Sequence, residues 1–230
     1  MKSLCFSGCS ITWGDELVHR LEERYSNLVS QHYECSHNNI SDKGLSNDAI
    51  VRRTIQHLQH KRYEVVVMQY TVHQRIEYIS ERAETEKWTP QKLDSQMKRH
   101  YYKWIYNDVM GAENLWKNIF LFDSYCKSVG QKYVSIIADH YEPVFGKPFQ
   151  YYQRVSKEDW SKNSDVRGVR KNGYWRSLLR DYKTCLMHRE ILGLQDVNPE
   201  LYSMHNKGGH PSAKAHKLIA NKIIELIDAI

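Results

Sequence analysis

A serine and a histidine at opposite ends of the chain are of types that could together carry out nucleophilic catalysis. Ser10 lies in the segment Gly8–Gly14, between an apolar stretch and a helical pattern. Backbone N–H groups at such a helix start can stabilise a developing oxyanion. His210 stands next to Pro211, just before the last helical pattern, where it could act as a general base. Taken singly, each has a commoner role: Ser10 as a helix cap, and His210, one of 12 histidines, as a surface residue.

A third segment with functional potential is the loop Asp42–Asn47, in which Gly44 would allow the backbone to approach a ligand closely. By itself the loop fits an ordinary turn rich in glycine and asparagine equally well. In open parallel α/β sheets, ligands bind at the carboxyl ends of the strands. Whether the three segments form one site therefore depends on the elements that precede and follow them.

The histidines near the carboxyl terminus do not follow a metal-binding pattern. His205, His210 and His216 are five and six residues apart, which matches no common zinc spacing, and no cysteine or carboxylate lies among them. The five cysteines of the chain lack CxxC spacing, which favours reduced thiols over a disulfide framework. We therefore expect neither a metal ion nor another cofactor.

Three apolar runs predict buried strands. Residues 2–7 precede a glycine, residues 64–70 are almost all β-forming, and residues 133–138 have the same character. A weak strand is expected near 33–35, followed by a polar loop over 36–47 that is rich in Ser, Asn, Asp and Gly. The strand at 64–70 suits the centre of a parallel sheet, because it is apolar on both faces.

Apolar residues at helical spacing predict four helices: about 15–31 with Asp15 as its cap, about 47–60, about 115–130, and 213–230. Strands and helices thus alternate along the chain. This alternation predicts an α/β fold with right-handed crossovers, namely a flavodoxin-like three-layer α/β/α sandwich around a parallel sheet of about five strands.

Size and composition predict a single domain. The 230 residues are 41% hydrophobic and 26% charged, which is typical of a globular chain large enough for a full core. Two stretches, about 73–112 and 139–186, interrupt the pattern and are interpreted as insertions in one domain spanning 1–230. Because no apolar run is long enough to cross a membrane and the first residues do not resemble a signal peptide, we expect a cytoplasmic protein without membrane contact.

Three short motifs, in order along the chain, resemble the blocks of the SGNH/GDSL hydrolase family. The segment Gly8–Gly14 reads G-C-S-I-T-W-G and is similar to the first block, G-D-S-x-T-x-G. Gly44–Asn47 is similar to the second block, and His210 with Pro211, before a terminal helix, is similar to the last. The matching parts are residues 4–71 and 205–224, and the two insertions have no counterpart in the family.

The resemblance implies that Ser10 is the nucleophile of an ester hydrolase and that His210 is its general base. It further implies that the backbone N–H groups of Ser10 and Gly44 donate to the oxyanion. The third block would place Thr71 at the remaining oxyanion-hole position, where the family has asparagine. A threonine hydroxyl can still donate one hydrogen bond, although with shorter reach.

The most consequential departure from the family concerns the catalytic acid. An acidic residue is expected two or three positions before the histidine, but Gly208 and Lys207 stand there. His210 would then lack the partner that fixes its tautomer and stabilises the imidazolium. We expect a carbonyl or an acid from elsewhere in the chain to contact the second ring nitrogen, with nearby backbone favoured over Asp196. The aspartate of the first block is replaced by Cys9, for which only a local packing role is expected.

The second insertion is basic and aromatic. Between Arg154 and Lys183, nine Lys or Arg and four Asp or Glu give a net charge of +5, close to the +6 of the whole chain. Such a segment suits a polyanion, a glycan or single-stranded nucleic acid, and equally a solvated face over packed aromatics. We expect it to cover the Ser10–His210 cleft. Four residues are assigned to substrate binding: Asn47, Arg75, Arg170 and Trp175.

The sequence therefore predicts a serine esterase that cleaves a small acyl ester, such as an acetyl ester, with a carbohydrate as the favoured alcohol. A second interpretation stays open, namely a weakly active or inactive protein of the same fold that binds a glycan or polyanion. It is motivated by the missing acid and by the threonine at position 71. No nucleic-acid recognition motif occurs in the chain, so nucleic acid is not an expected partner.

Overall fold

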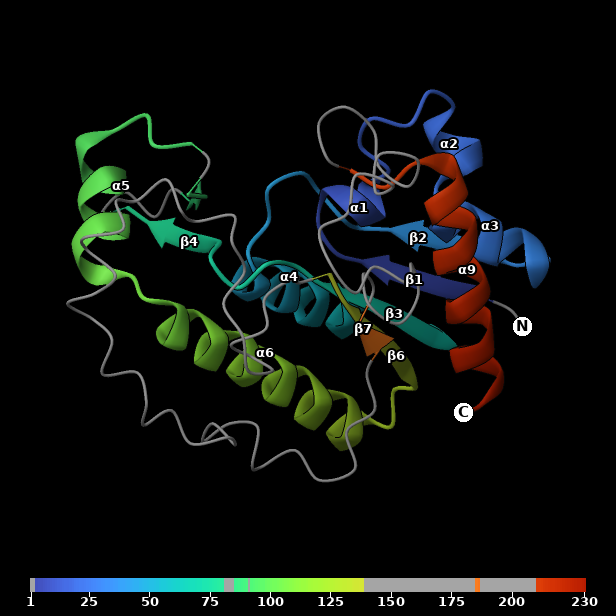
Figure 1. Ribbon diagram of the computed structural model, residues 1–230. Coiled ribbons are helices and arrows are strands. Elements are labelled where there is room, and N and C mark those ends of the chain that lie inside the picture. Colours follow the sequence, from blue (N-terminus) through green and yellow to red (C-terminus); the bar gives the residue numbers. More distant parts are fainter. Residues whose placement is uncertain (1–2, 81–84, 91, 139–184, 187–209) are drawn as a thin grey trace.

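A parallel β-sheet forms the centre of the protein (Figure 1). The computed structural model describes residues 3–80, 85–90, 92–138, 185–186 and 210–230. Within these ranges the strands of the central sheet lie in the order β2 (Ser36–Asn39), β1 (Ser3–Ser7), β3 (Val65–Tyr70), β6 (Tyr133–Ile137) and β7 (Cys185–Leu186). All four neighbouring pairs are parallel. This is the flavodoxin-like strand order, and it confirms the predicted α/β fold.

The central strand β3 is buried along its whole length, as its uninterrupted apolar sequence predicts. Cys5 of β1 pairs with Val66 of β3, and Tyr133 of β6 pairs with Val66 from the other side. Successive side chains of a strand point to opposite faces, so β3 supplies apolar groups to two separate cores.

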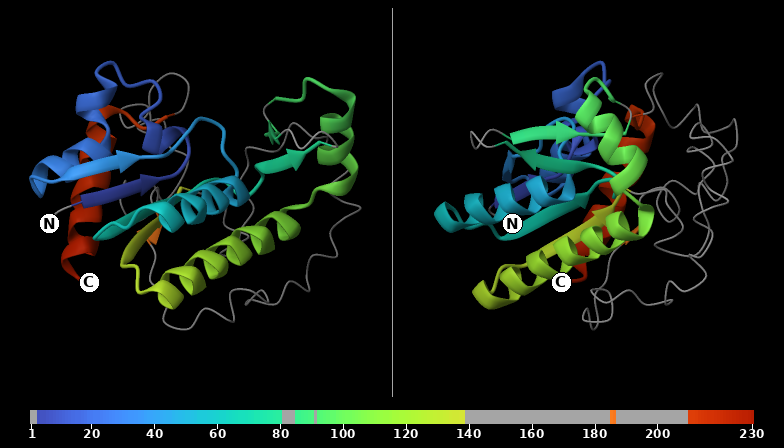
Figure 2. Two further views of the ribbon diagram at one scale, coloured as in Figure 1. Left: turned by 180° about the vertical axis from the view of Figure 1, so that it is seen from behind. Right: turned by 90° about the vertical axis from the view of Figure 1, so that its left-hand side faces the viewer.

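Helices cover both faces of the sheet and complete a three-layer sandwich (Figures 1 and 2). On one face, α4 (Asn47–His60) and α6 (Asp108–Val129) bury a row of apolar side chains against the sheet. On the other face, α3 (Tyr25–His32) and α9 (Ala213–Asp228) do the same. Large members of the first core are Ile50, Leu58, Leu115, Ile119 and Phe122, and of the second Phe6, Tyr25, Val29, Ile219 and Ile223.

The longer helices start at polar caps that the sequence supplies. The Ser46 hydroxyl accepts a hydrogen bond from the backbone N–H of Ala49 at the start of α4, at 3.2 Å. The Ser212 hydroxyl accepts one from Ala215 at the start of α9. Such caps satisfy backbone donors that have no partner inside the helix. The start of α4 agrees with the predicted helix at 47–60, whereas α6 begins earlier than the predicted 115.

The predicted helix over 15–31 is wrong, because three short helices occupy this region. They are α1 (Ser10–Trp13), α2 (Arg20–Glu23) and α3. Gly14 ends α1 in the left-handed conformation, with φ of 82°, and Arg24 is extended between α2 and α3. Asp15 lies in the turn after α1 and is not a helix cap. Of the apolar residues whose spacing predicts this helix, Tyr25 is buried, whereas Leu21 is 61% exposed. The turn at Gly14 and the extended Arg24 break the helix, so the predicted apolar face is not continuous.

The prediction for the first edge of the sheet is also corrected. The strand expected near 33–35 lies instead at Ser36–Asn39, within the predicted polar loop. Its residues pair in register with Ser3–Phe6 of β1, and β2 is the outermost strand on this side among the described residues. Because an edge strand is only partly buried, polar residues such as Asn38 and Asn39 can form it. Composition alone could not distinguish this edge strand from a loop.

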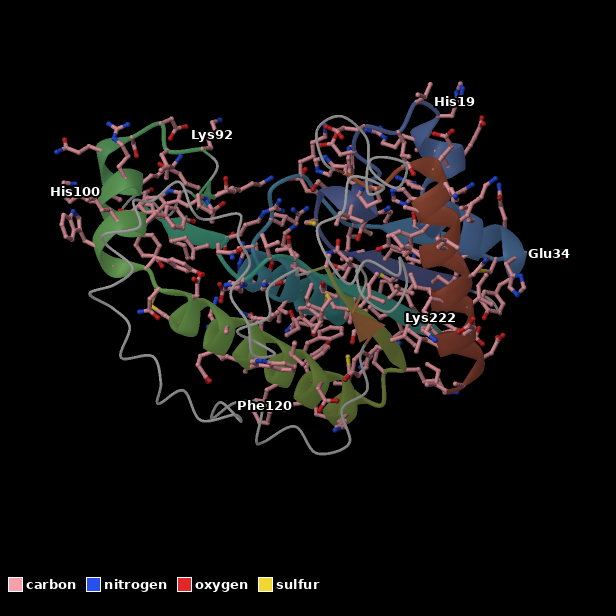
Figure 3. All side chains as sticks on the ribbon, viewed as in Figure 1. His19, Glu34, Lys92, His100, Phe120 and Lys222 are labelled. Carbon is pink, nitrogen blue, oxygen red and sulfur yellow. The ribbon has the colours of Figure 1, made fainter. Side chains whose placement is uncertain are left out.

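The stretch after β3 forms a small structured unit rather than part of the central sheet. Strands β4 (Ile76–Ile79) and β5 (Thr85–Trp88) pair antiparallel, and α5 (Gln96–His100) continues into a π-helical turn at Tyr101–Ile105. The rings of Tyr78 and Trp88 stack at 4.7 Å, and Trp88 also meets Tyr101 edge-on. Figures 2 and 3 show this unit, with Lys92 and His100, at the end of the molecule opposite Lys222 of α9.

The predicted insertion at 139–186 lies outside the described residues, except for the two residues of β7. In the described part of the chain no helix is long and apolar enough to cross a membrane.

Replacing Phe122 by Ala should lower the free energy of unfolding by about 3–5 kcal/mol, because its fully buried ring fills the core between α6 and the sheet. The neighbouring Leu121, which is 45% exposed on the same helix, is the matched control. Leu121→Ala should change stability by less than about 0.5 kcal/mol. Urea unfolding followed by circular dichroism measures both. Equal losses in the two variants would contradict the assignment of this helix face to the core.

Candidate active site

The turn that carries Ser10 contains Gly8, and any side chain at this position would displace neighbouring atoms. Gly8 lies between β1 and α1. A Cβ atom added to Gly8 would stand 2.7 Å from Oε1 of Gln69 and would overlap the hydroxyl of Thr12. Glycine is therefore required here by close approach rather than by its backbone angles. Ser10, the first residue of α1, consequently lies directly above the end of the sheet.

The Gln69 side chain, near the end of β3, holds this turn in place by hydrogen bonds. Its Oε1 atom accepts hydrogen bonds from the backbone N–H of Cys9 at 3.2 Å and from the Thr12 hydroxyl at 2.9 Å. The Thr12 hydroxyl also lies 2.6 Å from the hydroxyl of Tyr25 on α3. All four residues are buried. A buried network with each polar group paired positions the turn rigidly.

His210 reaches Ser10 from the other end of the chain. Its Nε2 atom lies 2.9 Å from Oγ of Ser10, across 200 residues of sequence. The residue is placed by the start of α9, which follows two residues after Pro211. Ser10 is only 4% exposed, whereas the His210 side chain is 23% exposed. At this distance, a serine hydroxyl and an imidazole have the geometry of a nucleophile and its general base.

Two carboxylates from the turn after α1 lie beside the His210 ring. Oε2 of Glu16 is 3.4 Å from Nδ1 of His210 and also accepts the backbone N–H of His210, at 3.3 Å. Oδ2 of Asp15 is 3.9 Å from Nε2, and Asp15 forms an ion pair with Lys43. The sequence predicts a carbonyl or an acid from elsewhere near Nδ1, with backbone favoured, and the group that lies there is the Glu16 carboxylate. Asp196 lies outside the described residues.

The loop Asp42–Asn47 lies against the serine turn. The backbone N–H of Asp42 donates to the carbonyl of Gly8, at 3.4 Å. Gly44 has a φ of 71°, a conformation that favours glycine. The buried Asn47 side chain bridges to the loop after β3, since it donates to the Thr71 carbonyl at 3.0 Å and accepts the Thr71 N–H at 2.8 Å. In this arrangement the Asn47 amide positions the backbone of Thr71.

Cys9 and Arg75 give the floor of the site an unusual charge environment. Burial acts to raise the pKa of the Cys9 thiol, but the Arg75 guanidinium and hydrogen bonds from Thr71, Ile11 and Ser10 outweigh it and lower the pKa. The Arg75 Nε and Nη1 atoms are buried and have no hydrogen-bond partner among the described residues. A cationic group of this kind could bind an anionic or polar part of a ligand.

A second histidine, His216, lies on α9 behind the site. Its Nδ1 atom accepts the backbone N–H of Tyr25 at 3.2 Å, and its ring stacks on that tyrosine. Burial, and after it the nearby charge of His210, lowers the pKa of His216 to about 4. His216 is therefore neutral at physiological pH and serves as a hydrogen-bond acceptor that connects α9 to α3.

The structure brings together most of the residues that the sequence singles out. Ser10 and His210 are in contact, and the loop that contains Gly44 and Asn47 is hydrogen-bonded to the serine turn through Asp42. Asn47 in turn holds Thr71, whose hydroxyl contacts Cys9. Arg75 acts on Cys9, next to Ser10. Arg170 and Trp175 lie outside the described residues. No cluster of three or more His, Cys, Asp or Glu side chains suited to a metal ion occurs in the described ranges.

Sequence reasoning missed three site residues: Thr12, Glu16 and Gln69. Thr12 belongs to the first motif, but its bonds to Gln69 and Tyr25 require the tertiary structure. Gln69 is the polar residue within an otherwise apolar strand, and this exception was the available signal. For Glu16, the signal was a pair of acidic residues directly after the glycine of the serine turn.

Comparisons with known proteins support the same fold. No family model matches the sequence, and a search of curated proteins found no match. A G-D-S-L family protein of known structure from Desulfitobacterium hafniense DCB-2 is 13% identical, with 97% of this chain and 98% of that chain covered and a TM-score of 0.55. The esterase EstA from a Pseudoalteromonas species is 14% identical, with coverage of 99% and 97% and a TM-score of 0.55.

A third structure, of a carbohydrate esterase, is 10% identical, with a TM-score of 0.50 and coverage of 100% of this chain and 65% of that chain. The chain therefore has the α/β/α fold of the SGNH/GDSL hydrolases, as its three motifs indicate. At these identities the likeness concerns the fold, and what the site does is inferred from its own geometry.

Protonation of His216 should make folding stability depend on pH. Its pKa is lowered from 6.5 to about 4 in the folded protein, so its contribution is fully present above pH 6.5 and is lost as the pH falls towards 4. The loss amounts to about 3 kcal/mol. His216→Asn keeps an acceptor near the Tyr25 N–H but cannot be protonated. Its unfolding free energy should therefore fall less than that of wild type between pH 6.5 and 4.

The exposed His100 on α5 provides the control, since His100→Asn should retain the pH dependence of wild type. Urea unfolding at several pH values measures all three proteins. A pH dependence unchanged in His216→Asn would show that His216 does not titrate on unfolding.

Proposed function

We propose that the protein is a serine esterase of the SGNH/GDSL type, in which Ser10 is the nucleophile and His210 the general base. The observation that carries the proposal is the 2.9 Å contact between Ser10 Oγ and His210 Nε2, at the carboxyl edge of a parallel sheet. Both residues stand at the positions of the motifs that resemble the family. Ligands bind at this edge in open α/β sheets.

The reaction follows from this contact. Oγ of Ser10 attacks the ester carbonyl carbon while its proton moves to Nε2 of His210. The tetrahedral intermediate then collapses, the bond from carbon to the alcohol oxygen breaks, and Nε2 returns the proton to the leaving alcohol. Water, deprotonated by the same nitrogen, next attacks the acyl-serine. Its proton passes through His210 back to Oγ, so that the acid is released and the enzyme restored.

The oxyanion would be stabilised by donors on the two loops beside Ser10. The backbone N–H groups of Ser10 and Gly44 make no hydrogen bond to another described residue, so both are free to donate. The Thr71 hydroxyl is engaged with the Cys9 sulfur and would have to turn to reach the substrate. The two backbone donors are therefore the stronger candidates, each contributing about 3 kcal/mol to transition-state stabilisation.

The proposed substrate is a small acyl ester, such as an acetyl group, carried by a polar or carbohydrate alcohol. The cationic Arg75, without a hydrogen-bond partner for two of its nitrogens among the described residues, favours a polar or anionic ligand over an alkyl chain. A structurally similar protein is a carbohydrate esterase, which supports a sugar as the alcohol. Arg170 and Trp175 remain proposed substrate contacts, and Asn47, whose amide is engaged with Thr71, is proposed to act on the substrate through Thr71.

The alternative is a protein of the same fold that binds a glycan or polyanion with weak or no hydrolysis. It is favoured by one observation: Nδ1 of His210 makes no hydrogen bond within the described residues. A fluorophosphonate probe separates the two cases, because it labels a serine only when that serine is activated as a nucleophile. Stoichiometric labelling at Ser10 excludes the inert site, and absence of labelling supports the binding protein.

Ser10→Ala and His210→Gln should each reduce kcat/KM for p-nitrophenyl acetate by about a thousandfold or more, because each removes one partner of the proton transfer. Both variants should keep the melting temperature of wild type within a few degrees. Ser128→Ala, which changes an exposed serine on α6, should retain full activity. Hydrolysis followed at 405 nm is the measurement. Wild-type activity in Ser10→Ala would exclude the proposed nucleophile.

A further inference from the structure

We propose that Glu16 is the positioning residue for His210 and takes the part of the acid that the last motif lacks. The proposal rests on the proposed function of Ser10 and His210. Glu16 would orient the imidazole and stabilise the imidazolium from a place in the chain six residues after the nucleophile, instead of shortly before the histidine. Serine, acid and histidine would then follow one another in chain order.

The geometry around His210 favours this assignment. One carboxylate oxygen of Glu16 accepts the backbone N–H of His210 at 3.3 Å and lies 3.4 Å from Nδ1 of the same residue. The opposite ring nitrogen, Nε2, lies 2.9 Å from Ser10 Oγ. The ring therefore stands between a nucleophile and a carboxylate, each facing a different nitrogen. The distance to Nδ1 is slightly longer than a formed hydrogen bond, and a small closure with substrate bound would complete it.

The neighbouring carboxylate of Asp15 is less suited to this part. It approaches Nε2 rather than Nδ1, and at 3.9 Å it is farther from the ring. Nε2 must accept the proton of Ser10, so a carboxylate on that side would not hold the productive tautomer. Asp15 also forms an ion pair with Lys43, which offsets its negative charge.

The backbone at Glu16 is an independent sign that this residue is held in place. Its φ of 65° lies in the left-handed region, which side chains other than glycine adopt only at a cost. The other such residue in the described chain is Glu34, directly after α3. Non-glycine residues in this conformation cluster at active sites. With Gly14, Glu16 turns the chain so that one short segment presents both the nucleophile and a carboxylate to His210.

The chemical consequence concerns the proton on Nδ1. A carboxylate facing Nδ1 keeps the proton on that nitrogen and so leaves the lone pair of Nε2 directed at Ser10. When Nε2 takes the proton of Ser10, the ring becomes positively charged, and the adjacent carboxylate stabilises it. The Nδ1 proton stays on the ring throughout.

The test compares Glu16→Gln, Glu16→Asp, Asp15→Asn and Ser10→Ala with wild type in ester hydrolysis. Glu16→Gln should lower kcat by about a hundredfold or more with KM changed less than about threefold. Glu16→Asp, which restores the charge, should recover at least about tenfold of that loss. Asp15→Asn, the matched change one residue earlier, should cost at most about fivefold.

The outcomes separate this proposal from the proposed function. If Ser10→Ala abolishes hydrolysis and Glu16→Gln stays within threefold of wild type, Glu16 is not the positioning residue, and the esterase assignment stands. If wild type shows no hydrolysis that depends on Ser10, the esterase assignment fails and the role of Glu16 is decided by NMR instead.

For that purpose the His210 ring is observed in ¹⁵N-histidine-labelled protein, its signals being identified by their absence from His210→Gln. In wild type, His210 should carry its neutral-state proton on Nδ1, and in Glu16→Gln that proton should be found on Nε2 in a larger share of the molecules, because the substitution removes the carboxylate that faces Nδ1. The same tautomer populations in both proteins would overturn the proposal.

Discussion

Parallel pairing of β1 with β3 is the interaction on which the rest of the structure depends. It brings the ends of two strands to one edge of the sheet, where Ser7 of β1 lies opposite Met68 of β3. Gln69, the next residue of β3, can therefore reach the turn above β1 and bond both Cys9 and Thr12. Without this register the Ser10 turn would have no fixed position. The burial of Gln69 among apolar strands is tolerated because its amide group is hydrogen-bonded at both ends.

The second constraint is electrostatic, and it links the site to the layer behind it. His210 stands between a hydroxyl and a carboxylate, whereas His216, six residues later on α9, is buried and neutral. The two histidines thus have different roles: His210 is partly exposed and contacts Ser10, whereas His216 accepts a hydrogen bond from the backbone of Tyr25. Because Tyr25 also contacts Thr12, the core beneath α9 and the serine turn form one connected network.

The same network explains how the chain can depart from the family pattern and still form a site. Cys9 stands where the first motif usually has aspartate. Its backbone N–H and its thiol both donate hydrogen bonds to the Gln69 side chain. Thr71, where the family has asparagine, is held by Asn47. Each departure is accommodated by a neighbouring amide side chain. The third departure, the lack of an acid shortly before His210, is not accommodated by an amide side chain. Here a carboxylate from another loop, that of Glu16, lies beside the His210 ring.

The sequence by itself determined the fold class, the strands at β1, β3 and β6, the helices α4 and α9, and the two segments that contain Ser10 and His210. These features follow from local periodicity and short motifs, which a single segment carries. Only the tertiary structure decided that Ser36–Asn39 is an edge strand, that the helix expected over 15–31 is broken, and that Glu16 lies against Nδ1 of His210. The physical reason is that contacts between residues nearly 200 positions apart depend on strand order and on the turn at Gly14, and neither leaves a periodic trace in the sequence.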